Sequence, residues 1–129
     1  MNLKMLVFSF ISIIFLLSGC SNVQSNPNNK YELIVVHLND VHGRAEEGKY
    51  DGMGYPKVAS ILNEYRQIFG KENVLYLDAG DNTHGTTFAT LEKGESMINL
   101  SNEMKLDAIT LGNHDFNYGM EQLFKLEDM

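Results

Sequence analysis

The sequence has 129 residues, so it can form at most one domain. Its 17 acidic residues outnumber the 10 basic ones and give a formal net charge of −7. This balance argues against a surface for nucleic-acid polymers, which needs a basic patch. A lone cysteine excludes an internal disulfide framework, so an ordinary hydrophobic core must hold the folded part.

The first 20 residues are predicted to be a signal peptide. Lys4 supplies a positive charge, and residues 6–17 (LVFSFISIIFLL) form an uncharged apolar run, shorter than the roughly 20 residues of a membrane-spanning helix. Small residues then precede Cys20, a pattern that resembles the bacterial lipobox. This resemblance implies a lipidated Cys20 that anchors a secreted protein to the bacterial cell membrane, facing outside the cytoplasm. The alternatives are an ordinary signal peptide with a chance cysteine, or a free buried cysteine.

Strands and helices alternate from Tyr31 onward, after a polar tether at residues 21–30 that has little to bury. Apolar, β-branched runs predict strands at residues 33–38, 74–77 and 108–111. Apolar residues at helical spacing predict helices at residues 56–69, 95–104 and 118–126. This βαβαβα order predicts an α/β fold with a parallel sheet covered on both faces. Ligands of such sheets bind beyond the carboxyl ends of the strands.

Polar side chains follow each predicted strand at that end. Asp40 and His42 follow the first strand, Asp81 the second, and Asn113 and His114 the third. An Asp-x-His pair offers oxygen and imidazole nitrogen, which suit Zn²⁺, Mn²⁺ or Fe, and a carboxylate at position 81 has two oxygens with which to bridge two cations. Two cations about 3.5–4 Å apart can hold a phosphate ester and activate water, while a histidine beside them donates a proton.

Each motif alone has a simpler interpretation. Asp40 and His42 can be a solvated loop pair, Gly80-Asp81 a turn, and residues 113–115 a helix cap. Their joint occurrence, each at the end of a strand, favours a metal site. Two further histidines are interpreted differently: His37, within a strand, as a core residue or a neighbour of the ligands, and His84 as a loop or substrate-side group.

These motifs resemble those of the calcineurin-like metallophosphoesterases: Asp40-Val41-His42, Gly80-Asp81-Asn82 and Gly112-Asn113-His114-Asp115. The longer stretches 38–43, 77–81 and 110–119 are similar to the bacterial 5′-nucleotidase branch, which includes UDP-sugar hydrolases and cyclic-nucleotide phosphodiesterases.

The resemblance implies hydrolysis of nucleotide or nucleotide-sugar phosphate esters by a metal-bound hydroxide. It implies two divalent ions (Zn, Mn, Mg, Ca or Co) in a dinuclear site with His114 as the catalytic histidine. The implied ligands are Asp40, His42, Asp81, which would bridge the ions, and Asn113. The implied fold is the N-terminal half of an αββα sandwich.

The sequence departs from this family in two ways. Many 5′-nucleotidases have an aspartate at the position of Asn117, paired with the catalytic histidine. Asn117 can orient an imidazole but cannot stabilise an imidazolium by charge, so monoesterase and cyclic phosphodiesterase activities both remain open. The family also has further histidine ligands downstream. We therefore expect residues 31–129 to be a truncated catalytic domain, inactive alone; a non-catalytic surface lipoprotein is the alternative.

Overall fold

The computed structural model describes residues 31–49 and 52–129. The predicted signal peptide, the tether and Cys20 lie outside the described residues. Residues 32–129 form one compact unit. Within the described part of the chain, no helix is both long enough and apolar enough to cross a bilayer.

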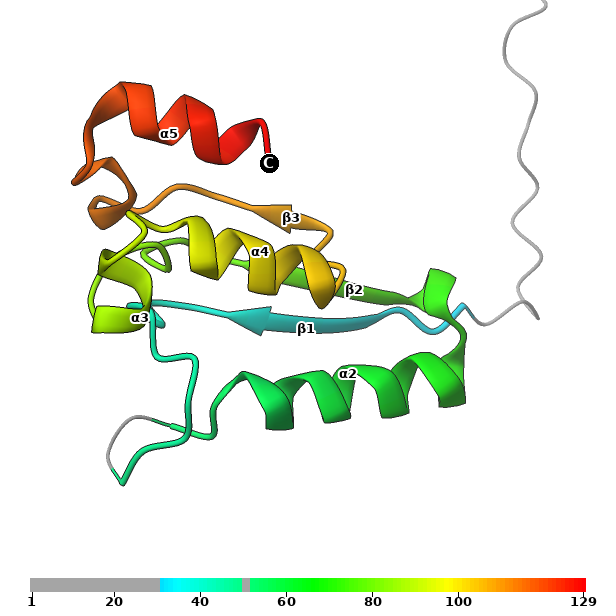
Figure 1. The fold of residues 1–129 in the computed structure, drawn as a ribbon. Helices are drawn as coiled ribbons and strands as arrows, with labels where there is room; N and C mark the ends of the chain where they lie inside the picture. Colours follow the sequence, from blue (N-terminus) through cyan, green and yellow to red (C-terminus); the bar gives the residue numbers. More distant parts are fainter. Residues whose placement is uncertain (1–30, 50–51) are drawn as a thin grey trace, which may run out of the picture. The chain divides into compact units, whose positions relative to one another are not determined.

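The centre of this unit is a parallel sheet of three strands in the order β1-β2-β3 (Figure 1). Strand β1 spans Ile34–Leu38, β2 spans Val74–Asp78, and β3 spans Ala108–Ile109. The predicted α/β fold with a parallel sheet is therefore confirmed. Strand β3 is shorter than predicted, although the Thr110 amide still donates to the carbonyl of Asp78 at 3.0 Å.

Helices connect and follow the strands. Helix α2 spans Tyr55–Phe69, α3 Thr87–Thr90, α4 Glu95–Glu103 and α5 Gly119–Glu127, with short 3₁₀ turns at η1 (Lys71–Asn73) and η2 (His114–Phe116). The sequence predicted α2, α4 and α5 to within one residue at each end. It missed α3 and η2, because one turn of helix is too short to show an apolar period.

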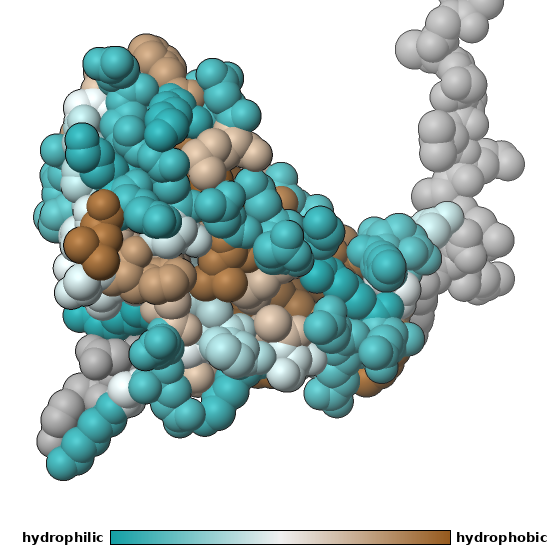
Figure 2. All heavy atoms as spheres, in the orientation of Figure 1, coloured by the Kyte–Doolittle hydropathy of each residue, from teal (hydrophilic) through white to brown (hydrophobic). Residues whose placement is uncertain are grey.

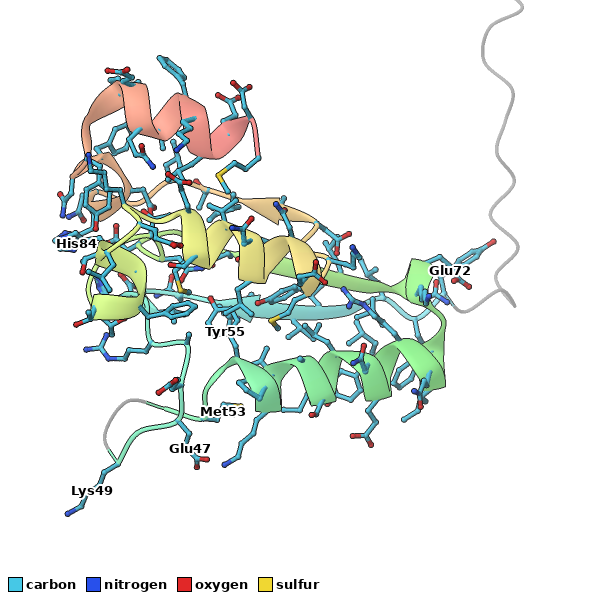
Figure 3. All side chains as sticks on the ribbon, viewed as in Figure 1. Glu47, Lys49, Met53, Tyr55, Glu72 and His84 are labelled. Carbon is cyan, nitrogen blue, oxygen red and sulfur yellow. The ribbon has the colours of Figure 1, made fainter. Side chains whose placement is uncertain are left out.

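The hydrophobic core lies between one face of the sheet and the helices. Alternate residues of β2, Val74 and Tyr76, are buried, and they pack with Leu62 of α2 and Met97 of α4. Tyr55, labelled in Figure 3 at the start of α2, belongs to the same core. The core thus fixes β1 and β2 against the helices, so the loops that leave these strands start from defined positions.

The opposite face of β1 is open, which corrects two expectations. Val35 is 50 % exposed and His37 is exposed, because strand periodicity turns residues 35 and 37 away from the core face. Helices therefore cover only one face of β1, and His37 is not a core histidine. Hydrophobic surface also shows between hydrophilic side chains in the view of Figure 2.

Candidate metal centre

The loops after β1 and β2 remain paired beyond the strands. The Asp40 amide donates to the carbonyl of Gly80 at 3.2 Å, and the His42 amide donates to the carbonyl of Asp81 at 2.9 Å. These bonds continue the parallel pairing into the loops at the carboxyl edge of the sheet. They bring Asp40, His42 and Asp81 together, as the order of the motifs predicted.

Three predicted ligands have left-handed backbones. The φ angles are 52° at Asp40, 52° at His42 and 57° at Asp81, a region that residues other than glycine rarely adopt. Each such residue costs on the order of 1–3 kcal/mol and persists only where its surroundings hold it. The segment from Asp40 to His42 is therefore not extended, so its left-handed backbone and not strand periodicity sets the direction of these two side chains.

The three side chains converge tightly. One ligand atom from each of Asp40, His42 and Asp81 lies within 4.8 Å of the others, and Asp81 is buried at 7 % exposure. Two carboxylates and an imidazole are donors that suit Zn²⁺, Mn²⁺ or Fe. The chemistry and spacing of these donors fit a divalent cation.

Asn113 and His114 approach the same carboxylate from the third strand. The His114 amide donates to Asp81 Oδ1 at 2.6 Å. The Asn113 side-chain amide has two orientations. In the first its nitrogen donates a hydrogen bond to Asp81 Oδ2 at 3.3 Å, and in the second its oxygen faces that carboxylate. The second orientation places amide and carboxylate oxygens side by side, which is the arrangement that a shared cation would need.

Gly112 allows this close approach. A Cβ atom built on Gly112 would lie 2.2 Å from Asp81 Oδ1, far inside contact distance. Gly80 is equally confined, because its Cβ would lie 2.4 Å from the Gly112 amide nitrogen. The two loops therefore cross with glycines facing each other, and the Asp81 carboxylate fits against the loop that carries Asn113.

Gly112→Ala should displace the Asp81 carboxylate and lower the affinity for Mn²⁺ by about 10–100-fold, the range seen when the support of a metal ligand is lost. Isothermal titration with Mn²⁺ measures the change. Gly119→Ala is the control, because a Cβ there meets nothing within 4 Å although φ is 82°. An equal loss in both variants would mean that the clash with Asp81 is not the cause of the effect.

Asp115 ties the loops together, a role that the sequence did not reveal. It is 1 % exposed and accepts hydrogen bonds from the amides of Asp81 (2.8 Å) and Gly112 (2.9 Å). It also accepts from the Thr83 hydroxyl at 2.6 Å and the Thr83 amide at 3.2 Å. Burial raises the pKa of Asp115, but the hydrogen bonds from Thr83, Gly112 and Asp81 outweigh it and hold the pKa below its ordinary value. The alternative of a helix cap at residues 113–115 is not supported, because η2 has no side-chain cap hydrogen bond.

A second buried carboxylate, that of Asp78, supports the loop that follows β2. Asp78 accepts from the Gly80 amide at 2.9 Å and from Asn82 Nδ2 at 2.7 Å. Asn82 also donates to the Tyr55 hydroxyl at 2.8 Å, which links the loop to α2. Burial raises the pKa of Asp78, and the bonds from Gly80 and Asn82 offset this only in part. Asp78 thus holds the residues on either side of Asp81, whereas Asp115 holds the amide of Asp81 itself.

The His114 ring contacts side chains from all three loops of the candidate site. Asn117 Nδ2 lies 2.9 Å from His114 Nδ1, so the predicted partner is in hydrogen-bond range. The His42 ring meets it edge-on with centroids 5.2 Å apart, and the His84 ring stacks on it with centroids 5.4 Å apart. The structure therefore brings the predicted metal ligands, His114 and Asn117 to one edge of the sheet, and His84, labelled in Figure 3, lies there with them.

Comparison with known proteins points to one family. The calcineurin-like phosphoesterase domain matches residues 33–128. Human 5′-nucleotidase is 39 % identical over 105 residues, which cover 74 % of this chain and 18 % of the relative. A 5′-nucleotidase of Vibrio parahaemolyticus is 30 % identical over 135 residues, covering 99 % and 24 %. The calcineurin-like phosphoesterase YfkN from Bacillus subtilis has a similar structure, with a TM-score of 0.56 and 26 % identity over 73 % of this chain and 33 % of that one. The chain thus spans about a fifth of the length of the curated relatives it matches.

Proposed function

The chain belongs to the calcineurin-like phosphoesterase family, and from this we propose that it contributes to the metal-dependent hydrolysis of nucleotide phosphate esters. The observation that carries the proposal is the convergence of Asp40, His42 and Asp81 within 4.8 Å. Relatives named 5′-nucleotidase support a nucleotide or nucleotide sugar as the substrate.

We propose that Asp40, His42, Asp81 and Asn113 hold two divalent ions. Asp81 is suited to serve both, because its Oδ1 lies against the His114 amide while Oδ2 faces the Asn113 side chain. When bound, such ions polarise a phosphate ester and lower the pKa of water. The acidic groups of the chain do not exclude a phosphate substrate, since bound cations dominate the local charge.

His114 is proposed to donate a hydrogen bond to the departing oxygen. When the Asn117 amide donates to His114 Nδ1, the proton of the neutral imidazole resides on Nε2. Nε2–H can then stabilise the negative charge that develops on the departing oxygen, which takes its proton from water. Asn117 orients the ring but adds no negative charge to stabilise an imidazolium, so the neutral ring is the form proposed to act.

Four side chains are few for two catalytic ions. A catalytic zinc site usually has three protein ligands for each ion, so two ions that share Asp81 need at least one donor more than these four. We propose that the chain by itself shows no metal-dependent hydrolysis above its His114→Ala variant. The test therefore needs a protein with the remaining donors: a chimera in which residues 31–129 replace the matching segment of the Vibrio parahaemolyticus relative.

In this chimera, His114→Ala should lower kcat on AMP with Mn²⁺ by about 10²–10³-fold, the usual cost of losing one hydrogen-bond donor to a developing negative charge. UDP-glucose, a cyclic nucleotide and an aryl phosphate, assayed in parallel, identify the preferred ester. Metal content by elemental analysis is the control, because His114 is not proposed as a ligand. Equal activity of the chimera and its His114→Ala variant would contradict the proposal, and a chimera that binds no nucleotide and hydrolyses none of these esters would favour the non-catalytic alternative.

We also propose that Cys20 carries a lipid anchor, on the basis of the apolar run that ends at this residue. Cys20→Ser should move the protein from the membrane fraction to the soluble fraction, because a signal peptide without lipidation leaves no apolar anchor. Fractionation of bacterial cells and immunoblotting measure the shift. Ser18→Ala, a small residue exchanged for another within the same motif, should stay in the membrane; equal retention of wild type and Cys20→Ser would disprove the anchor.

A further inference from the structure

His84 lies in the loop between β2 and α3, at the edge of the sheet that carries the candidate ligands (Figure 3). Its ring is nearly parallel to the His114 ring, with an interplanar angle of 10° and a centroid distance of 5.4 Å. The His84 ring also contacts the Tyr118 ring, with centroids 5.6 Å apart and an interplanar angle of 47°. The His84 ring thus contacts two aromatic rings.

The backbone on both sides of His84 is held firmly. Before it, the Thr83 amide and hydroxyl both donate to the buried Asp115. After it, Gly85 lies so close to the His42 carbonyl that a Cβ would be 2.2 Å from that oxygen, and the Thr86 amide donates to the same carbonyl at 3.1 Å. Since both neighbours are fixed, the direction of the Cα–Cβ bond at position 84 is fixed as well.

The hydrogen bond to Asn117 constrains His114 at one atom, Nδ1. Its partner Asn117 is an exposed side chain, so this bond by itself holds the ring only loosely. The stack with His84 and the edge contact with His42 define the plane of the ring. An imidazole N–H bond lies in the plane of its ring. The orientation of the ring therefore sets the direction of the N–H bond.

We propose that His84 is a positioning residue, which holds the plane of the His114 imidazole by stacking and so directs its Nε2–H. In this role His84 neither binds a metal nor transfers a proton. Aromatic pairs of this kind stabilise a packing arrangement by about 0.5–1.5 kcal/mol, enough to favour one ring orientation several-fold. The inference rests on the proposed function of His114.

The test compares His84→Phe with His84→Ala in the chimera. Phenylalanine keeps a ring that can stack but has no nitrogen, whereas alanine removes the ring. For a positioning residue, His84→Ala should lower kcat by about 2–10-fold with KM and metal content unchanged, since misorientation affects the reacting geometry and not the binding of substrate. His84→Phe should restore most of kcat. If His84→Ala disturbs folding, His84→Leu, which has a similar volume to the ring, replaces it in the comparison.

Other outcomes overturn the inference. If His84→Phe is as slow as His84→Ala and both raise KM, His84 binds the substrate through a ring nitrogen. If His84→Ala loses metal, His84 is a ligand. If neither variant changes kcat, the stack has no role in the reaction.

A measurement without turnover separates this inference from the proposed function. In the full chain, labelled at histidine and kept in detergent, the His114 ring protons feel the ring current of His84. Their NMR resonances should shift in His84→Ala and remain close to wild type in His84→Phe. Unchanged His114 resonances in His84→Ala would refute the stack even if the chimera proved to be inactive, whereas an inactive chimera with the expected shifts would refute only the proposed reaction.

Discussion

Asp81→Asn is expected to remove most of the bound metal from the chimera and to lower kcat on AMP by more than about 10³-fold. Asparagine keeps the shape of the side chain and an oxygen that can accept from the His114 amide, at 2.6 Å in the wild type. It loses the negative charge and the second ligating oxygen, so one group can no longer serve two cations. Elemental analysis and initial rates measure the two effects.

Two controls accompany this variant. Asp128→Asn changes an exposed carboxylate at the end of α5 and should alter neither quantity. His84→Ala should keep its metal, because His84 is not proposed as a ligand. If Asp81→Asn retains two equivalents of metal, or if His84→Ala loses as much as Asp81→Asn does, the proposed ligand set is wrong.

Asp115→Ala is expected to have the largest effect on stability. It would leave the amides of Asp81, Thr83 and Gly112 and the Thr83 hydroxyl without their acceptor. Each buried group left unpaired costs about 1–3 kcal/mol, so the loss should exceed about 3 kcal/mol in total. Urea unfolding of the chimera measures the change, from the transition in which this domain unfolds. Thr83→Val removes one of these donors and should cost about 1 kcal/mol; a cost for Asp115→Ala no larger than this would show that the four bonds contribute little.

The stabilisation by Asp115 should also depend on pH in one direction. Because its pKa is lowered in the folded protein, folding favours the charged carboxylate. Its contribution is therefore complete above the unfolded pKa of about 3.9 and declines as the pH falls below that value. The difference in unfolding free energy between wild type and Asp115→Asn should narrow from pH 6 toward pH 3. A difference that grows in acid would mean that the protonated carboxyl is the stabilising form.

Much of the fold was predictable because its signals are local and periodic. The apolar run that became β1 and the helical spacing that became α2 are visible without tertiary information. Parallel pairing then follows from the alternation of strands and helices, and it places Asp40, Asp81 and Asn113 at one edge. The position of the candidate site therefore follows from topology.

The sequence did not predict how the site is held, since that depends on contacts between distant residues. The four bonds to Asp115 join loops that are 32 to 34 positions apart in the chain, apart from the one to Gly112. The left-handed φ of Asp40 and His42 was not predictable from residue type, because aspartate and histidine adopt it more often than other side chains but still only occasionally. The open face behind Val35 was also missed, because an apolar strand shows the same pattern whether or not its second face is covered.

The bonds to Asp115 also have a consequence for the time scale on which this region opens. The amides of Asp81, Thr83 and Gly112 belong to loops, where exchange with solvent deuterium is usually fast. Because all three donate to one buried carboxylate, they can exchange only when the loops separate together. Their deuterium uptake should therefore be slow and share a single rate. The exchange rate of these three amides therefore reports how often the site opens. The measurement needs no substrate.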